Sequence, residues 1–411
     1  SDAFSSTNIS QFEIIYFPST LLEIEDGAFS NFKNLNTIGY INEDNDLINN
    51  TLPPLLTKIN DDVFSHCQML TTIDTNNVIE LGTRCFQFCI RLTTLKLRSI
   101  EIIGPYSLAS IQLLNTIELP KNLREIQSYA FAKSSIVTIT GEVPNLQIIK
   151  TSFFGCSDLE SIPKLTGIIE LQSSTFSNCR NLKEVHCGPN LTTIYANCFT
   201  SCSSLEYFTT SSENYFISME AFNQCSSLKK FNFSGVTEIL NDAFIACISF
   251  DVIDMSNSRL EIISPIFQDC GDLSSVILPP NLSEFNVNIF EGSNVHSITF
   301  SGTKGMIDLT GAFFECRFDL YEVIFAPSCR ATFFATFASC YHLSRVVLPT
   351  EPYSLYDTFS HCLNLTEVKN IEFCISLDYA FFSCEKLTHF DAFPQITNLG
   401  NQTFMNCKSL K

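Results

Sequence analysis

The residues with the most obvious chemistry are the 18 cysteines, which could be disulfide partners, metal ligands or nucleophiles. Most of them occupy one position of a recurring segment, Phe-x-x-Cys-x-x-Leu, as in Phe222, Cys225 and Leu228. The 13 cysteines at this position are Cys67, Cys89, Cys156, Cys179, Cys202, Cys225, Cys247, Cys270, Cys316, Cys340, Cys362, Cys384 and Cys407. The five other copies carry Thr7, Phe32, Ile111, Ser134 and Ser293. A position that accepts such different residues is interpreted as a packing position, filled by free buried thiols.

Two alternatives for these cysteines, disulfide bonds and a zinc site, are less favoured. Stacked parallel coils keep equivalent Cβ atoms about 4.8 Å apart, whereas a disulfide needs roughly 3.5–4.5 Å. Zinc is the sharper alternative, because the pairs Cys85/Cys89 and Cys198/Cys202 have near-ligand spacing. No matched second pair lies near either of them, so we expect no metal and read Cys85 and Cys198 as small buried residues.

The other residues that could do chemistry form no recognisable site. The six histidines are scattered, and the chain has no Gly-x-Ser-x-Gly elbow, no phosphate-binding loop and no Gly-x-Gly-x-x-Gly. Asn42–Asp46 offers oxygen ligands, but it lacks the glycine and terminal glutamate of a calcium loop, so we expect a solvated loop. These observations predict a protein that is not an enzyme and holds no cofactor or metal.

The recurring segment defines the organisation of the chain. Taking its Phe as the anchor of each copy gives 18 anchors, with one substitution at Leu108. They are Phe4, Phe29, Phe64, Phe86, Leu108, Phe131, Phe153, Phe176, Phe199, Phe222, Phe244, Phe267, Phe290, Phe313, Phe337, Phe359, Phe381 and Phe404. From Phe64 onward the anchors are 22 to 24 residues apart. A period of this length indicates a stacked repeat, in which neighbouring units bury a core that none could bury alone.

Each copy contains two extended segments. A Leu six residues after the anchor and a β-branched residue nine after it, as in Leu114 and Ile117, lead into Glu118-Leu119-Pro120, which predicts a short strand. A second apolar pair follows, as in Leu123 and Ile126, before the next anchor. The anchor segment itself is interpreted as a helical turn. Ile139 and Ile298 come one residue early and Leu320 one late, which predicts bulges or changes in turn length.

The stretch Leu114–Phe131, LNTIELPKNLREIQSYAF, resembles the BspA-like leucine-rich repeats, whose pattern is close to L-x-x-I-x-L-P-x-x-L-x-x-I-x-x-x-A-F-x-x-C. The resemblance extends over essentially the whole chain. It implies an α/β repeat solenoid: a right-handed array of about 18 coils, with parallel strands on the concave face and short helical turns and extended segments elsewhere. Members of this family include surface and secreted proteins, so the resemblance links the chain to adhesion and matrix binding.

We predict a single solenoid over residues 1–411, with a degenerate first repeat at about 1–28. The polar stretch at about 39–53 predicts a projecting loop, because it lengthens the interval from Phe29 to Phe64 to 35 residues. The chain stops at Lys411 where a strand should begin. Since a cut solenoid exposes strand edges, we expect the natural chain to continue or another chain to cover this end.

Composition limits the classes of partner that the chain is expected to bind. The net charge of −19 argues against nucleic acid, which needs clustered Lys and Arg. No run of 18 apolar residues is present, so we expect no membrane insertion within this stretch. Seven Asn-x-Ser/Thr sequons are compatible with secretion without establishing it. They lie at Asn8, Asn49, Asn190, Asn232, Asn281, Asn364 and Asn401.

The outward residues of the first strand in each copy, eight and ten after the anchor, are the candidate partner-binding residues. Those with binding chemistry are Glu184, His186, Tyr207, Thr209, Lys230, Asn232, Asp254 and Arg345. The leading hypothesis is a non-enzymatic recognition or adhesion module at the cell surface or outside the cell, with a protein or glycan partner. The alternative is a structural assembly protein that associates end to end or decorates a filament in the cytoplasm or cytoskeleton, where free thiols are usual.

Overall fold

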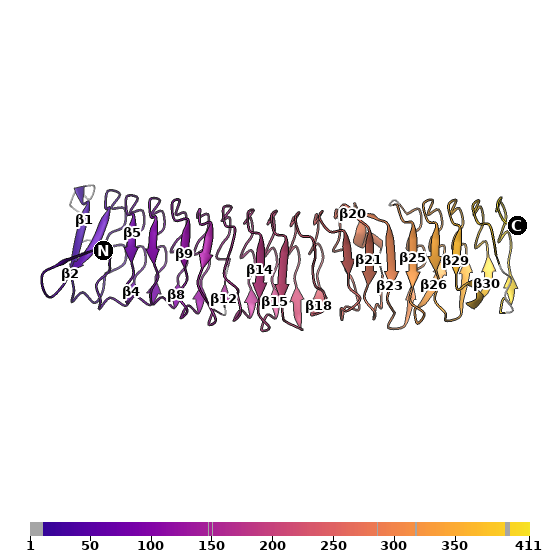
Figure 1. Cartoon of the computed structure of the whole chain (residues 1–411), viewed down its shortest axis with the longest axis horizontal. Helices are drawn as coiled ribbons and strands as arrows, with labels where there is room; N and C mark the ends of the chain where they lie inside the picture. The colour runs from indigo at the N-terminus through magenta and orange to yellow at the C-terminus, as the bar shows by residue number, and fades with distance from the viewer. Residues whose placement is uncertain (1–10, 147, 150, 286, 317–318, 391–394) are drawn as a thin grey trace. The chain divides into compact units, whose positions relative to one another are not determined.

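The computed structural model describes residues 11–146, 148–149, 151–285, 287–316, 319–390 and 395–411. These residues form two compact units, Ser1–Ser227 and Leu228–Lys411, which are described one at a time. Each unit is built from short parallel strands stacked coil upon coil, with about 17 turns along the chain (Figure 1). The prediction of a repeat solenoid is confirmed. That the two units form one continuous solenoid stays a prediction.

In unit 1, the segment after each anchor contributes to a first sheet and the segment before the next anchor to a second. First-sheet strands pair as β5 (Thr72–Asp74) with β7 (Thr94–Lys96), β9 (Thr116–Glu118) with β11 (Thr138–Thr140), and β14 (Glu184–Cys187) with β16 (Tyr207–Thr210). Second-sheet strands run in the order β4 (Lys58–Ile59), β6 (Glu80–Leu81), β8 (Ile102–Ile103), β10 (Glu125–Ile126), β12 (Ile148–Ile149), β13 (Glu170–Leu171), β15 (Thr193–Ile194) and β17 (Tyr215–Ile217). All these neighbours are parallel, as the stacked-coil prediction requires.

The inserted stretch near the start folds as a hairpin. Strand β1 (Ile14–Pro18) pairs parallel with β2 (Thr37–Ile41), which pairs antiparallel with β3 (Leu47–Asn49). The side-chain oxygen of Asn42 accepts bonds from the backbone N–H groups of Asp44 and Asp46, at 3.0 and 2.7 Å. The polar residues of this loop therefore bond to one another across the hairpin turn.

In unit 2 the first sheet is continuous, in the order β19 (Val252–Asp254), β21 (Ser275–Leu278), β23 (Ser297–Phe300), β25 (Glu322–Phe325), β27 (Arg345–Val347) and β29 (Glu367–Lys369). The second sheet runs β24 (Met306–Asp308), β26 (Arg330–Phe334), β28 (Tyr353–Tyr356), β30 (Cys374–Asp378) and β31 (Asn398–Leu399). Strands β20 (Asp272–Leu273) and β22 (Asn294–Val295) form a separate pair, and β18 (Val236–Ile239) precedes them. Helix is nearly absent: apart from Gln11, the 3₁₀ segments of the described residues are η2 (Val287–Phe290) and η3 (Ile371–Phe373).

The anchor segments form single turns. In the coil of Phe64, the Cys67 N–H donates to the Phe64 carbonyl at 3.2 Å, and His66 has a left-handed φ of 62°. Alternate N–H groups point along the stack: those of Phe64 and His66 donate to carbonyls of Cys85 and Gln87 in the next coil, at 2.9 and 2.8 Å. The turns thus form a third ladder of hydrogen bonds beside the two sheets, which we call the turn ladder.

The anchors form the core. All anchors from Phe29 to Phe381 are buried, Phe404 is half-buried, and Phe4 lies outside the described residues. Neighbouring rings stack nearly parallel, as for Phe153, Phe176 and Phe199 in unit 1, with centroids 5.3 and 5.4 Å apart. In unit 2, Phe337, Phe359 and Phe381 stack at 5.6 and 5.4 Å. One packing slot filled repeatedly by Phe therefore accounts for the abundance of this residue.

Candidate functional site

The recurrent cysteines are held as hydrogen-bond donors. The thiol of Cys156 donates to the carbonyl of Phe131 in the preceding coil at 3.0 Å, and Ser134 fills the same position with a hydroxyl that donates to Leu108 at 2.7 Å. Burial raises the pKa of Cys156 to about 12, which keeps the thiol protonated and able to donate. All 18 cysteines are free thiols. The position is therefore both a packing and a donor position, a role that the sequence analysis missed.

Metal chemistry finds no support in the part of the chain that the structure describes, which holds no group of three or more ligating side chains. In the two pairs with near-zinc spacing, the second thiols donate to backbone carbonyls: Cys89 to Phe64 at 3.2 Å and Cys202 to Phe176 at 3.0 Å. None of the helices in the described ranges is long and apolar enough to span a membrane.

The predicted partner-binding residues of unit 1 lie together on the first sheet. Glu184 and His186 on β14 stand opposite Tyr207 and Thr209 on β16. His186 Nδ1 is 2.6 Å from Thr209 Oγ1, and its Nε2 is 3.2 Å from Glu184 Oε2. Tyr207 is 46% exposed. A hydroxyl, an imidazole and a carboxylate in line resemble a nucleophile with its base, but they lie on an open sheet rather than in a cleft, so we read them as a contact surface.

The remaining predicted residues belong to unit 2. Lys230, Asn232 and Asp254 are exposed, and Asp254 lies at the outer edge of the first sheet, opposite Ile277. Arg345 lies four strands further along this sheet. The structure therefore separates Arg345 from Asp254 and places it in another neighbourhood.

Arg345 stands between two carboxylates. The sheet register aligns Glu322 on β25, Arg345 on β27 and Glu367 on β29. The Arg345 guanidinium donates to Glu367 at 2.9 Å and forms an ion pair with Glu322. Beside this charged row, Ile277, Ile324 and Val347 lie half-buried. Alternating charges next to an apolar row form a surface suited to a partner of mixed polarity.

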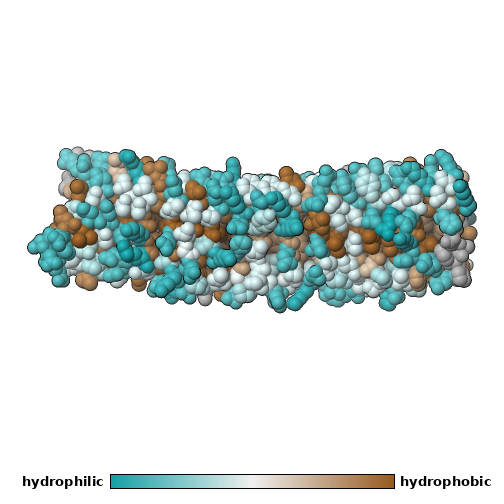
Figure 2. All heavy atoms as spheres, viewed as in Figure 1, coloured by the Kyte–Doolittle hydropathy of each residue, from teal (hydrophilic) through white to brown (hydrophobic). Residues whose placement is uncertain are grey.

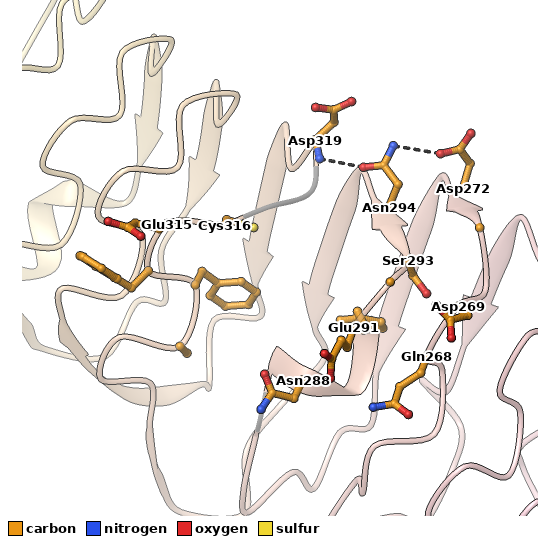
Figure 3. A pocket seen from close by; sticks show the side chains of 16 residues that line it. Gln268, Asp269, Asp272, Asn288, Glu291, Ser293, Asn294, Glu315, Cys316 and Asp319 are labelled. Carbon is orange, nitrogen blue, oxygen red and sulfur yellow. Dashed lines mark hydrogen bonds between the residues drawn. The ribbon is translucent and has the colours of Figure 1, made fainter.

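A cleft of about 1260 Å³ adjoins the first sheet of unit 2 (Figure 3). It opens between the anchor turns of Phe290 and Phe313, whose residues line it. The strands of the same two coils remain paired, with Ile298 opposite Val323. Val323 follows its anchor by ten residues and Ile298 by eight, so the second coil has two extra residues at this corner. The early Ile298 and late Leu320 noted in the sequence thus coincide with a cleft.

A polar and aromatic cluster borders this cleft, made up of Asn294, His296, Asp319, Tyr321 and His342. Asn294 donates to Asp272 at 2.9 Å and accepts from the Asp319 N–H at 2.8 Å, as Figure 3 shows. The Tyr321 ring lies between those of His296 and His342, with centroids 5.4 and 6.1 Å away. His342 Nε2 is 3.3 Å from Asp319 Oδ1. Tyr321 is 44% exposed, so the cluster presents an aromatic ring with polar neighbours to solvent.

The sequence analysis missed this cluster and both glutamates beside Arg345. Counting eight and ten residues from the anchor skips Glu322, which follows Phe313 by nine, whereas Arg345 follows Phe337 by eight. Aligning the apolar strand residues instead, as in Ile298 with Val323, would have brought Glu322 and Arg345 into the same row. Figure 2 shows one face of the molecule, where hydrophobic residues gather in small groups bordered by hydrophilic ones.

Unit 1 has a second opening, of about 730 Å³, between β7 and β9, which are not hydrogen-bonded to each other. Charges of both signs line it, among them Lys96, Arg98 and Glu118. Arg98 is already engaged, since its guanidinium bonds to both carboxylate oxygens of Asp74. This opening is a secondary candidate.

The asparagines of the sequons differ in solvent exposure. Asn49, Asn190, Asn232, Asn281 and Asn401 are exposed, while Asn8 lies outside the described residues. Asn364 is half-buried, and its amide donates to the Tyr341 carbonyl at 2.7 Å. Use of these sequons for glycosylation stays a prediction.

The chain matches a known family model and resembles several solved structures. The model of the BspA type leucine rich repeat region matches in six copies, over residues 1–44, 40–160, 146–270, 192–317, 237–366 and 309–411. Similar solved structures include a leucine-rich repeat protein from Bacteroides ovatus, 18% identical, covering 98% of this chain and 78% of that one with a TM-score of 0.28. A leucine rich cell surface protein from Faecalibacterium prausnitzii is 17% identical, with coverages of 97% and 86% and a TM-score of 0.27.

The pneumococcal vaccine antigen PcpA is also similar, at 19% identity, with coverages of 78% and 74% and a TM-score of 0.41. A comparison with curated proteins gives no match.

Proposed function

The chain belongs to the BspA-type leucine-rich repeat family, and from this premise we propose that it is a recognition module displayed outside the cell, which binds a protein or glycan partner through its first sheet. The binding surface comprises Arg345 with its flanking glutamates, the apolar row beside them, and the cluster around Tyr321.

One observation carries the proposal: an exposed tyrosine between two histidines directly precedes β25, the strand that carries Glu322 of the row Glu322, Arg345 and Glu367. Tyrosine and arginine are the residues that contribute most often to binding hot spots, because each offers a large contact area with directed polar atoms. A sheet surface built on a rigid stack of buried rings loses little conformational entropy on binding. Within the described residues, no group of three or more metal-ligating side chains competes with this surface.

The predicted residues of unit 1 form a separate candidate surface. His186 is oriented by Glu184 and Thr209, so its ring is held in place before a partner arrives. Exposed Tyr207 stands opposite Glu184 across the strand pair. A partner that contacts both units would be weakened by substitutions in either, whereas separate partners would respond to one unit only.

The test is binding of the purified chain to an array of glycans and an array of extracellular matrix proteins. Tyr321→Ala and Arg345→Ala should each reduce affinity for the captured partner by at least roughly fivefold, the effect of about 1 kcal/mol. Tyr356→Ala is the matched control, because Tyr356 is 42% exposed but lies on β28 of the second sheet. Unchanged binding by both first-sheet variants, or an equal loss in the control, would refute the proposed surface.

The assembly alternative gives a different result in the same preparation. A chain that polymerises end to end should increase in mass with concentration, without any added partner. Sedimentation of the chain over a wide concentration range distinguishes the two functions, since a recognition module keeps one mass.

A further inference from the structure

The side-chain amide of Asn294, in the cluster around Tyr321, has only one orientation that fits its neighbours. Its oxygen, Oδ1, accepts a hydrogen bond from the backbone N–H of Asp319 at 2.8 Å, and a backbone N–H can only donate. Its nitrogen, Nδ2, faces the other way and donates to Asp272 Oδ1 at 2.9 Å, as Figure 3 shows. Both contacts require the same orientation, so the amide is fixed from two sides.

The orientation of this amide determines the protonation state of His296. Asn294 Nδ2 lies 3.2 Å from His296 Nε2. Because Nδ2 carries two hydrogens and accepts none, Nε2 must be the acceptor, which requires a neutral imidazole with its proton on Nδ1. An imidazolium would bring two N–H groups against each other. The contact therefore exists only while His296 is neutral.

Three carboxylates surround the cluster, and each already has another partner. They belong to Asp272, Asp319 and Glu322, which contact an amide, an imidazole and a guanidinium, respectively. In the described part of the chain no ion pair involves His296. Protonation of His296 would break its bond to Asn294 and draw the ring toward these carboxylates.

The ring of His296 is one wall of the site that Tyr321 occupies. The two ring centroids are 5.4 Å apart, and the Tyr321 N–H donates to the His296 carbonyl at 2.9 Å. On the far side of Tyr321 stands His342, the other titratable ring of the cluster, whose Nε2 is 3.3 Å from Asp319 Oδ1. A positive charge strengthens that contact. Acid therefore has opposite effects on the two sides of Tyr321.

We propose that His296 is a pH-sensitive latch for the Tyr321 cluster: the neutral ring, bonded to Asn294, holds Tyr321 in place, and protonation releases it. The inference rests on the proposed function in one respect, that this cluster belongs to the binding surface. The bond requires the neutral ring, so its contribution is present at the higher pH and is lost as the pH falls. Since histidine changes charge between about pH 5 and 8, the surface is ordered near neutrality and released in mild acid.

The first test needs no partner. In the full chain labelled with carbon-13 at histidine, the ring carbon shifts distinguish the two neutral tautomers, and His296→Gln identifies the resonance. At about pH 7.5, His296 should be neutral with its proton on Nδ1. Asn294→Asp keeps the acceptor for the Asp319 N–H but replaces the donor with a carboxylate, so His296 should take up its proton at a higher pH than in the natural chain. A proton on Nε2, or uptake at the same or a lower pH in Asn294→Asp, would overturn the latch.

A reporter at position 321 tests whether the release reaches Tyr321. The chain has no Trp, so Tyr321→Trp introduces a single indole beside His296. Its emission should change between about pH 7.5 and 5.5, the range in which histidine titrates. Adding His296→Gln should remove most of this change, because glutamine can accept from Asn294 but cannot be protonated. An emission change that His296→Gln leaves intact would overturn the coupling to Tyr321.

Binding to the glycan and matrix-protein arrays is then repeated in mild acid. The affinity of the natural chain for the retained spots should be at least roughly fivefold lower at about pH 5.5 than at about pH 7.5, the effect of one hydrogen bond of about 1 kcal/mol. His296→Gln should lose this pH dependence, whatever its affinity at the higher pH. His361→Gln is the matched control and should keep it, because His361 packs against Phe382, with centroids 5.1 Å apart, on an anchor turn away from the cluster.

The outcomes separate the two proposals. An equal pH dependence in the natural chain and in His296→Gln would overturn the latch while leaving the binding surface in place. Arrays that retain the chain at no spot would contradict the proposed function, and the carbon-13 and emission measurements would still decide on the latch.

Discussion

The thiol of Cys179 donates a hydrogen bond to the backbone carbonyl of Phe153, one coil earlier, over an Sγ–O distance of 3.1 Å. Phe153 is itself the anchor of its coil, so each such bond joins the side chain of one repeat to the core residue of the preceding repeat. Ser293 makes the same contact with Phe267 through its hydroxyl, at 2.7 Å. The exchange of Cys for Ser in the sequence therefore reflects a shared donor rather than a tolerance of any small residue.

This contact predicts an order of stability among substitutions at Cys179. Serine keeps a donor and should stay within about 1 kcal/mol of the natural chain, whereas alanine loses both bond and volume and should cost roughly 1–3 kcal/mol. Urea unfolding monitored by circular dichroism measures both. Cys187→Ala is the control, since Cys187 is buried but makes no such bond in the described structure. Equal losses for Ala and Ser at Cys179 would contradict the donor role.

Removing an anchor ring should be more costly. Phe176 is fully buried between Phe153 and Phe199, so Phe176→Ala should destabilise the chain by about 3–5 kcal/mol through the cavity it leaves. Phe176→Leu should cost clearly less, because Leu108 occupies an anchor slot naturally. Hydrogen exchange should place the lost protection in the coils nearest residue 176, since repeats couple to their neighbours. Uniform loss over both units would argue against local coupling.

Acid should weaken the contact around Asp308. Hydrogen bonds from the hydroxyls of Thr332 and Thr310 and from the Thr310 N–H lower the pKa of Asp308 to about 2. A carboxyl with a depressed pKa in the folded state contributes stability above its unfolded pKa of about 3.9, and this contribution is lost as the pH falls toward 2. The free energy of unfolding should therefore drop more steeply between pH 4 and 2 in the natural chain than in Asp308→Asn. Parallel curves for the two proteins would exclude this contribution.

Arg345→Ala should alter binding without altering the fold. Its ion pairs with Glu322 and Glu367 are partly exposed, and such pairs contribute roughly 0–1 kcal/mol. Thermal unfolding should show a small change that disappears at high salt. A loss of several kcal/mol would mean that Arg345 is a structural residue, and any binding defect of that variant would then need another explanation.

The thiols offer a direct chemical check. A chain purified without reductant and then denatured, still without reductant, should react at all 18 cysteines. Before denaturation most should be protected, since burial raises the pKa of ladder thiols such as Cys67 and Cys270 to about 12. A denatured count far below 18 would indicate disulfides in the ladder.

The repeat could be recognised in the sequence because one residue type fills each structural position many times. The spacing of Phe153, Phe176 and Phe199 predicted stacked coils, and the structure places their rings in one stack. The outward positions of the first strand were also predictable from a fixed count, so that Glu184, His186, Tyr207 and Thr209 do lie together. That count failed for Glu322, which follows its anchor by nine residues.

What the sequence by itself determined is the period, the buried anchors and the face of each strand, because these depend on local patterns that every coil repeats. Only the tertiary structure decided how neighbouring coils pack against each other where the spacing of the repeat changes. The sequence shows that Ile298 and Leu320 depart from the regular spacing. Whether such a departure produces a bulge or a cleft depends on how the strands and the anchor turns of the two coils pack together. The paired strands kept their register, with Ile298 opposite Val323, while a cleft formed between the anchor turns of Phe290 and Phe313.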